Sequence, residues 1–363
     1  MDVLVERCCG LDVHQKFVVA CVLTPGKGNR VQKQIRRFRT VTAELEQLRE
    51  WLLEVGVTHV AMESTGVYWM SVYAVLATGE MQVIVGNAAH IKNVPGRKTD
   101  VKDAEWIAHL VRHGLIRASV VPTPQMKRLR EYTRLRRKLV GMRTSMRNRI
   151  LRQLETANIK LASFASDVFG VSGSLMIDAL IEGEQSPRQM ASLAKGALRK
   201  KRPDLELALR GKVEEHNRII MRMCRDLIAH IDEYIAALDG RIEHELTLLG
   251  DIVDRLTKIP GIDRTLAAVI IAELGIDMSF FPTHGHAASW AGVTPGRNRS
   301  AHKRTKPEHA RHGNTHLRAA LTQAATSAHK KKGTHFQDKY DRIARRRGKG
   351  RAILATAVSA RAG

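Results

Sequence analysis

Hydrophobic and polar positions in the first third of the chain change repeatedly between a strand pattern and a helical one. Residues 8–13 are a strand candidate, 17–23 are a β-branched run typical of a strand, and 59–63 and 81–85 are further short apolar runs. Between them, residues 41–55 repeat leucines at helical spacing. Strands alternating with helices predict a sheet covered by helices, so we expect the N-terminal region to be α/β.

After residue 121 the strand pattern disappears and long helical patterns follow. Few breakers interrupt residues 125–161 or 205–238, which predicts a coiled-coil-like helical region, whereas 164–174 has a loop composition. The last residues are highly charged, and we expect them to be disordered without a partner. The predicted domains are an α/β domain over 1–120, a helical coiled-coil region over 121–250, a mostly helical domain over 251–330 and a basic tail over 331–363.

The charge is strongly positive and unevenly placed. The chain has 363 residues, with 60 Lys and Arg against 36 Asp and Glu, a formal net charge of +24. Residues 126–152 hold eleven basic residues and one acid, and residues 297–351 hold seventeen and three. Two such patches predict a polyanionic partner, and the low aromatic content of 4% favours contacts with a nucleic-acid backbone over base stacking.

No apolar run of the sequence is long enough to span a membrane. The longest have about seven residues, well below the ~18 needed for a membrane span, and no signal peptide is recognisable at the N-terminus. Four cysteines show neither a CxxC motif nor a disulfide framework, as is typical of a reducing cytosol. We therefore expect a cytoplasmic, nucleoid-associated bacterial protein with no membrane partner.

Four carboxylates stand out by their positions. Asp12 and Glu63 lie in or at the end of predicted strands, and Asp100 and Asp103 share one face of a helix predicted over 98–112. Four acids brought together would repel one another, and divalent ions that clamp a phosphodiester relieve that repulsion. Spacing alone leaves another interpretation open, in which these acids cap a helix or lie on the surface.

The sequence around these acids resembles the DEDD class of insertion-sequence transposases. The resemblance rests on Gly-Leu-Asp12-Val-His, Glu63-Ser-Thr-Gly-Val-Tyr and Lys-Thr-Asp100-Val-Lys-Asp103-Ala, although Gln15 stands where the family often has Lys. It implies a RuvC-like domain of RNase H-like fold at the N-terminus, with the four carboxylates binding Mg²⁺ and acting in catalysis.

A second candidate is Ser300, which lies in a strongly basic segment. A serine hydroxyl is a weak nucleophile, and neighbouring cations could hold a phosphate near it. From the residues alone, an ordinary basic loop is the simpler interpretation. The segment resembles the family's Trp-Ala-Gly…Asn-x-Ser-Ala-Gly-Lys-Arg motif, whose serine is the recombinase nucleophile, but Arg299 replaces the common Glu and His302 replaces Gly.

The resemblance implies a DNA transposase and recombinase that exchanges strands between donor and target DNA. It further implies guidance by a noncoding bridge RNA, and homodimers that assemble into tetramers. The composition agrees with this, because few aromatic residues and many arginines suit contacts with nucleic-acid phosphates more than readout of the bases. The predicted nucleic-acid-binding residues are Arg128, Arg130, Arg134, Arg137, Arg297, Arg299, Lys303 and Arg304.

Two other functions remain open. One is a metal-dependent hydrolytic nuclease similar to a Holliday-junction resolvase, which would use only the carboxylates and leave no covalent intermediate. The other is a non-enzymatic protein that packages nucleic acid, for which the charge would suffice. The packaging function requires neither the paired Asp100 and Asp103 nor Ser300 in its basic segment.

Overall fold

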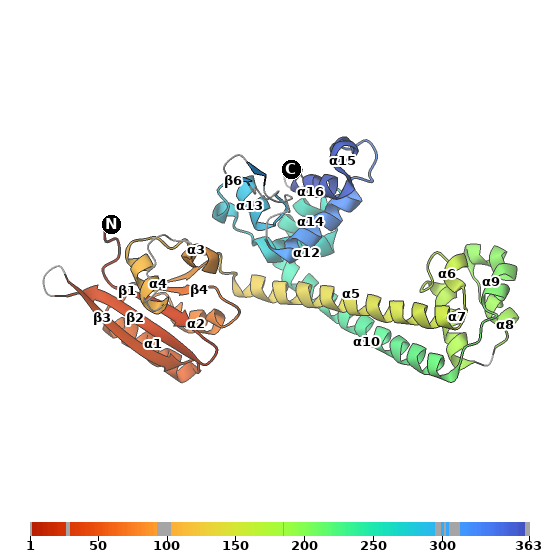
Figure 1. Ribbon diagram of the computed structural model, residues 1–363, viewed down its shortest axis with the longest axis horizontal. Coiled ribbons are helices and arrows are strands. Elements are labelled where there is room, and N and C mark those ends of the chain that lie inside the picture. The colour runs from red at the N-terminus through yellow and green to blue at the C-terminus, as the bar shows by residue number, and fades with distance from the viewer. Residues whose placement is uncertain are drawn as a thin grey trace. The chain divides into compact units, whose positions relative to one another are not determined.

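The computed structural model describes residues 2–26, 30–92, 103–183, 185–294, 299–300, 303–304 and 313–359. The chain forms two compact units, which we call unit 1 (Met1–Val121) and unit 2 (Pro122–Gly363) (Figure 1).

In the described part of unit 1, five strands form one mixed sheet in the order β3-β2-β1-β4-β5. β1 pairs antiparallel with β2 and parallel with β4, so its carboxyl end lies beside that of β4. The prediction of an α/β, RNase H-like N-terminal region followed by a largely helical remainder is confirmed. The strands are β1 (Cys8–Val13), β2 (Phe17–Pro25), β3 (Val31–Arg39), β4 (His59–Glu63) and β5 (Gln82–Gly86).

Helices cover both faces of this sheet because its central strands are apolar on both sides. Cys9, Leu11 and Val60 pack with α1 (Thr42–Glu54) and α2 (Trp69–Leu76) on one face. The opposite face packs against α4 (Asp103–Arg112). The short helix α3 (Ala88–Lys92) follows β5. We call the side covered by α4 the α4 face.

In unit 2, two long helices lie antiparallel, α5 (Pro124–Thr156) and α10 (Glu215–Leu246) (Figure 1). Ion pairs join the start of one to the end of the other, as between Arg128 and Glu245. Short helices lie where α5 ends and α10 begins, namely α6 (Leu161–Phe164), α7 (Val171–Glu182), α8 (Pro187–Ser192), η1 (Gly196–Lys201) and α9 (Arg202–Ala208). No helix of the described residues is long and apolar enough to cross a membrane.

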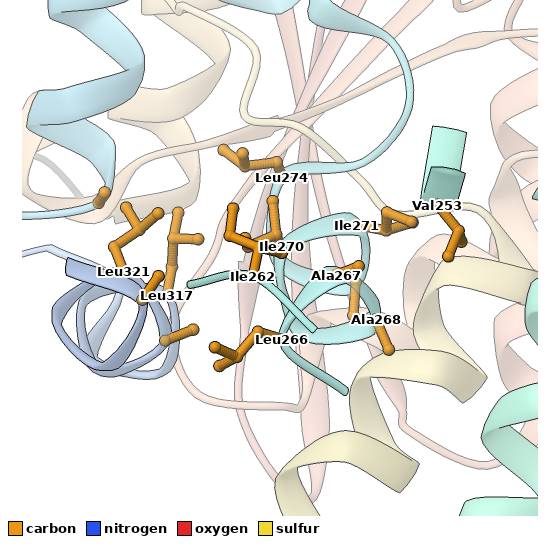
Figure 2. Close-up of a cluster of buried hydrophobic side chains, with 14 of the residues drawn as sticks. Val253, Ile262, Leu266, Ala267, Ala268, Ile270, Ile271, Leu274, Leu317 and Leu321 are labelled. Atoms are coloured by element: carbon orange, nitrogen blue, oxygen red, sulfur yellow. The ribbon is translucent and has the colours of Figure 1, made fainter. Parts of the chain in front are cut away.

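A second core forms near the N-terminal end of α5. Figure 2 shows how α12 supplies Leu266, Ala267 and Ile271 to a cluster that α14 joins through Leu317 and Leu321. The elements after α10 are η2 (Thr247–Leu249), α11 (Gly250–Thr257), α12 (Arg264–Leu274), η3 (Met278–Phe280), α13 (His284–Trp290), β6 (Arg299–Ser300), β7 (Lys303–Arg304), α14 (Thr315–Ala328), α15 (His335–Arg347) and α16 (Lys349–Ser359).

Two sequence expectations are wrong. The described residues after Lys330, which extend to Ser359, are not disordered, because they form α15 and α16, and the buried Ala357 of α16 packs into a core of unit 2. Its charge is concentrated in α15, which leaves α16 apolar enough to dock. The segment 164–174 is not all loop either, since α7 begins at Val171. The small side chains after that residue hid its helical pattern.

Candidate functional site

Asp12 and Glu63 lie side by side at the carboxyl ends of β1 and β4. The two strands are parallel, and the last pair in their register is Leu11 with Met62. The next residues in register are therefore Asp12 and Glu63, and neighbouring parallel strands are about 4.8 Å apart. Residues in register point to the same side of a sheet, so both carboxylates belong to the α4 face.

Asp103 reaches the same face because α4 packs unusually close to β1. A Cβ atom added to Gly10 would lie 2.2 Å from the backbone oxygen of Ala104, so only glycine allows this approach. Gly10 and Asp12 are two residues apart and share a face. Asp103, the first residue of α4, directly precedes Ala104. The fold thus brings three predicted carboxylates, Asp12, Glu63 and Asp103, to one side of the sheet.

The immediate partners of the two strand carboxylates are polar. The Nε2 atom of His14 lies 2.9 Å from Oδ2 of Asp12, and the Thr65 hydroxyl donates to Glu63. Among the described residues, no three acidic, His or Cys side chains are close enough together to hold a metal ion. Asp100, the fourth predicted ligand, lies outside the residues that the structure describes. Oxygen donors on one face nevertheless suit a hard divalent cation.

The cysteines of unit 1 are unsuited to nucleophilic or metal chemistry. Cys8, Cys9 and Cys21 are buried. Burial raises the pKa of the Cys8 thiol to about 11 and that of the Cys21 thiol to about 12. Because the thiolate is the reactive form, these side chains are inert near neutral pH and serve in packing.

Ser300 lies in a small hairpin of unit 2. β6 pairs antiparallel with β7, which places Ser300 opposite Lys303 and Arg299 opposite Arg304 in the register. The described backbone therefore brings together the serine and three of the cations predicted around it. The fourth predicted cation, Arg297, lies outside the described residues.

The two ends of the segment that carries Ser300 are fixed to each other. The backbone N–H of Asn314 donates to the carbonyl of Trp290 at 2.8 Å. A Cβ atom on Gly313 would lie 2.4 Å from the backbone nitrogen of Gly292, so the chain leaving the segment touches the chain entering it. The Asn314 side chain also caps α14 by accepting from the N–H groups of His316 and Leu317.

Glu273 anchors this junction to α5. Its carboxylate accepts from the Asn314 amide at 2.6 Å and pairs with Arg134 at 2.7 Å, while its side chain is 0% exposed. The Nε atom of Arg130 lies 3.5 Å from Oε2 of the same carboxylate. Burial raises the pKa of Glu273, but the hydrogen bonds from Arg134 and Asn314, together with the charges of Arg134 and Arg130, lower it more. The result is a pKa below the usual value, so Glu273 is ionised at neutral pH.

The same bonds occupy three of the arginines predicted to bind nucleic acid. Arg130 and Arg134 pair with Glu273, and Arg128 pairs with Glu245 at 2.6 Å. Arg137 differs, since no carboxylate of the described residues pairs with it. It lines an open groove with the hydroxyl-bearing face of α14, whose lining residues include Thr315, Arg318, Thr322 and Thr326. Nucleic-acid contacts by all four arginines stay a prediction, and the groove favours Arg137.

Sequence reasoning missed two features of these sites. The charge count placed no basic patch in the first third of the chain, yet β3 displays Lys33, Arg36, Arg37 and Arg39 at the edge of the sheet. Strand alternation could have shown that Arg37 and Arg39 share a face. Glu273 had no sequence signal, because a single acid inside an apolar helix reveals neither its burial nor its partners.

Comparison with known protein families bears on both sites. A family model described as a transposase, DEDD_Tnp_IS110, matches residues 9–159. A second model, described as the transposase IS116/IS110/IS902 family, matches residues 253–341. The first match includes Asp12, Glu63, Asp100 and Asp103, and the second includes Ser300. No curated protein matches this chain.

Proposed function

The chain belongs to the IS110 family of transposases, which are DNA strand-transfer enzymes of insertion sequences, and we propose that its reaction uses two sites. The first consists of Asp12, Glu63, Asp100 and Asp103, which together hold Mg²⁺. The second is Ser300, which acts as the nucleophile. The DEDD class implies carboxylates that bind a divalent metal, and Mg²⁺ is the ion we propose.

The observation that carries this proposal is the juxtaposition of Asp12 and Glu63 in register, with α4 bringing Asp103 to the same face. Buried or crowded carboxylates are costly unless a cation compensates them. A bound Mg²⁺ would supply Lewis-acid stabilisation of charge on a phosphate. His14, bonded to Asp12, fixes the orientation of that carboxylate from the exposed side.

In the proposed reaction, the oxygen of Ser300 attacks the scissile phosphorus and a phosphoserine bond forms. The bond from phosphorus to the leaving DNA oxygen breaks, which frees a strand end. A 3′ hydroxyl of another strand then attacks the phosphoserine and releases Ser300. The number of phosphate ester bonds stays constant, so no external energy source is needed. Arg299, Lys303 and Arg304, which flank or oppose Ser300 in the hairpin, stabilise charge on the phosphate.

We further propose that a noncoding bridge RNA pairs with donor and target DNA and thereby selects the sites of exchange. The protein would contact these nucleic acids through their backbones, as a net charge of +24 favours. We propose homodimers that assemble into tetramers, so that the carboxylates and the serine of one reaction site can come from different protomers. Such a complex would act on nucleoid DNA in the bacterial cytoplasm.

The carboxylate site is tested by Asp12→Asn and Glu63→Gln, with Glu46→Gln as the matched control. Glu46 is an exposed acid on α1, which covers the opposite face of the sheet. Loss of a metal ligand should lower DNA strand cleavage by at least about 100-fold, since a catalytic metal contributes several kcal/mol. Binding of Mn²⁺, followed by electron paramagnetic resonance, should weaken in parallel, whereas Glu46→Gln should resemble the wild type.

Full cleavage by Asp12→Asn, or undiminished Mn²⁺ binding by both site variants, would remove the carboxylate site from the proposal. A purely hydrolytic nuclease would also need the carboxylates. It differs from the proposed recombinase in leaving free ends with no protein attached, and only Ser300 separates the two functions.

A further inference from the structure

We propose that Arg37 is a DNA-positioning residue of unit 1, which holds the backbone of the DNA strand that is cleaved at the carboxylate site. This inference rests on the proposed function, because it assigns the phosphate contact beside that same site. The evidence for this role is the register of β4, β1, β2 and β3 and the contact of Arg37 with Phe17, all within the described part of unit 1.

The strand register places Arg37 in one row with the carboxylates. Asp12 pairs with Val19 across β1 and β2, and Val19 pairs with Arg37 across β2 and β3. Glu63 extends the row on the other side of Asp12. All of these residues share the α4 face, as Val19 confirms by packing against the α4 core. Arg37 therefore lies two strand spacings, or about 10 Å, from Asp12 at the backbone.

An arginine at this distance can reach a neighbouring phosphate of the same DNA strand. Successive nucleotides advance by 3.4 Å along a duplex, so about 10 Å corresponds to roughly three nucleotides. If the DNA strand cleaved at the carboxylates continues across the sheet toward β3, one of its neighbouring phosphates lies near Arg37. The row ends at the edge strand β3, and Arg37 is the cation at its end.

Stacking on an aromatic ring restrains the Arg37 side chain and leaves its hydrogen-bond donors available for a phosphate. Its guanidinium carbon lies 3.6 Å from the centre of the Phe17 ring, and stacking of this kind restricts the side chain without using its hydrogen-bond donors. Phe17 in turn lies 4.5 Å, between ring centres, from His14, which is bonded to Asp12. No carboxylate of the described residues pairs with Arg37.

The other cations of β3 are either paired with carboxylates or on the opposite face of the sheet, and Arg36, on that face, serves as the control. Lys33 pairs with Glu105, and Arg39 pairs with Glu44. Arg36 is exposed and stacked at 4.5 Å over the Trp51 ring, but it lies on the opposite face of the sheet. Basic residues on an edge strand can also discourage aggregation. That role would make Arg36 and Arg37 equivalent, whereas DNA positioning distinguishes them.

The experiment compares Arg37→Gln with the matched control Arg36→Gln in the full-length protein. Binding of a fluorescein-labelled, mixed-sequence DNA duplex is measured by anisotropy over a series of salt concentrations, in chelator so that no metal is required. Loss of one phosphate contact should make the log–log salt slope shallower by about 0.9 for Arg37→Gln and leave it unchanged for Arg36→Gln. Arg37→Lys keeps the charge and should keep most of the slope. Unchanged melting temperatures would show that the variants are folded.

Equal slopes for Arg36→Gln and Arg37→Gln would overturn the proposal. A slope that changes only with an RNA duplex of the same sequence would also overturn it, since the contact would then be with RNA. These results are independent of strand cleavage. If the wild type cleaves no DNA while the slopes differ as expected, the phosphate contact stands and the proposed function fails.

Discussion

Helix α5 and strand β3 are both rich in arginine, but they use it differently. On α5, Arg128, Arg130 and Arg134 bond to carboxylates of α10 and α12. On β3, Arg39 also pairs with a carboxylate, that of Glu44, whereas Arg37 stacks on an aromatic ring and stays exposed on the sheet face that carries the unit 1 carboxylates. Helix α5 carries more positive charge in the sequence than β3, but carboxylates of α10 and α12 neutralise much of that charge. The local supply of carboxylates, rather than the density of cations, decides which arginines can bind a phosphate.

The largest expected effect tests whether the α5 arginines are structural. Glu273→Ala leaves Arg134 and the partly buried Arg130 without their carboxylate, and breaking a buried pair in this way costs about 3–5 kcal/mol. The free energy of unfolding, measured with urea, should fall by that amount. Glu243→Ala is the control, because its pair with Arg264 is half exposed and is worth about 1 kcal/mol or less. Equal losses would show that Glu273 is not a special anchor.

A second prediction concerns the close approach of α4 to β1. Gly10→Ala introduces a Cβ atom against the backbone of Ala104, and such overpacking costs about 1–3 kcal/mol. Because α4 must shift, Asp103 moves away from Asp12, and DNA cleavage should fall more than DNA binding. Gly141→Ala on α5 meets no atom within 4 Å and should raise stability by about 0.5–1 kcal/mol. Wild-type cleavage by Gly10→Ala would contradict the shared carboxylate face.

The third prediction separates two arginines that are three residues apart on α5. Arg137→Gln should make the salt slope of DNA binding shallower by about 0.9, because Arg137 lines a groove and has no carboxylate partner among the described residues. Arg134→Gln should instead lower the free energy of unfolding and change the slope little, since Arg134 is bonded to Glu273. The reverse pattern would show that the internal ion pair does not prevent phosphate binding.

The smallest expected effect is the pH dependence of the Glu273 anchor. The pKa of Glu273 lies below its usual value of 4.5 in the folded protein, so its contribution to stability is complete above pH 4.5. That contribution is lost as the pH falls through the lower, folded-state pKa. The difference in unfolding free energy between wild type and Glu273→Gln should therefore shrink below pH 4.5. A difference that grows on acidification would contradict the assigned direction.

The sequence predicted the fold where local patterns agree with tertiary packing. Alternating strands and helices gave the unit 1 sheet, because a period of two or 3.6 reflects which side chains the core must cover. The positions of Asp12 and Glu63 at strand ends were also readable. The ion pairs of α5 were not, since they depend on acids more than a hundred residues away, such as Glu245 and Glu273. The docking of α16 was missed because average charge masked one apolar helix.

The proposed covalent bond between Ser300 and DNA can be tested by trapping it. Wild-type protein with Mg²⁺, and with any RNA that copurifies with it, is mixed with a nicked DNA that traps the intermediate. Adducts are separated on a denaturing gel and their attachment site is identified by mass spectrometry. DNA joined to the protein at Ser300 is expected in the wild type and in Ser289→Ala, and no adduct is expected in Ser300→Ala. Free cut ends without an adduct, together with full cleavage by Ser300→Ala, would contradict it.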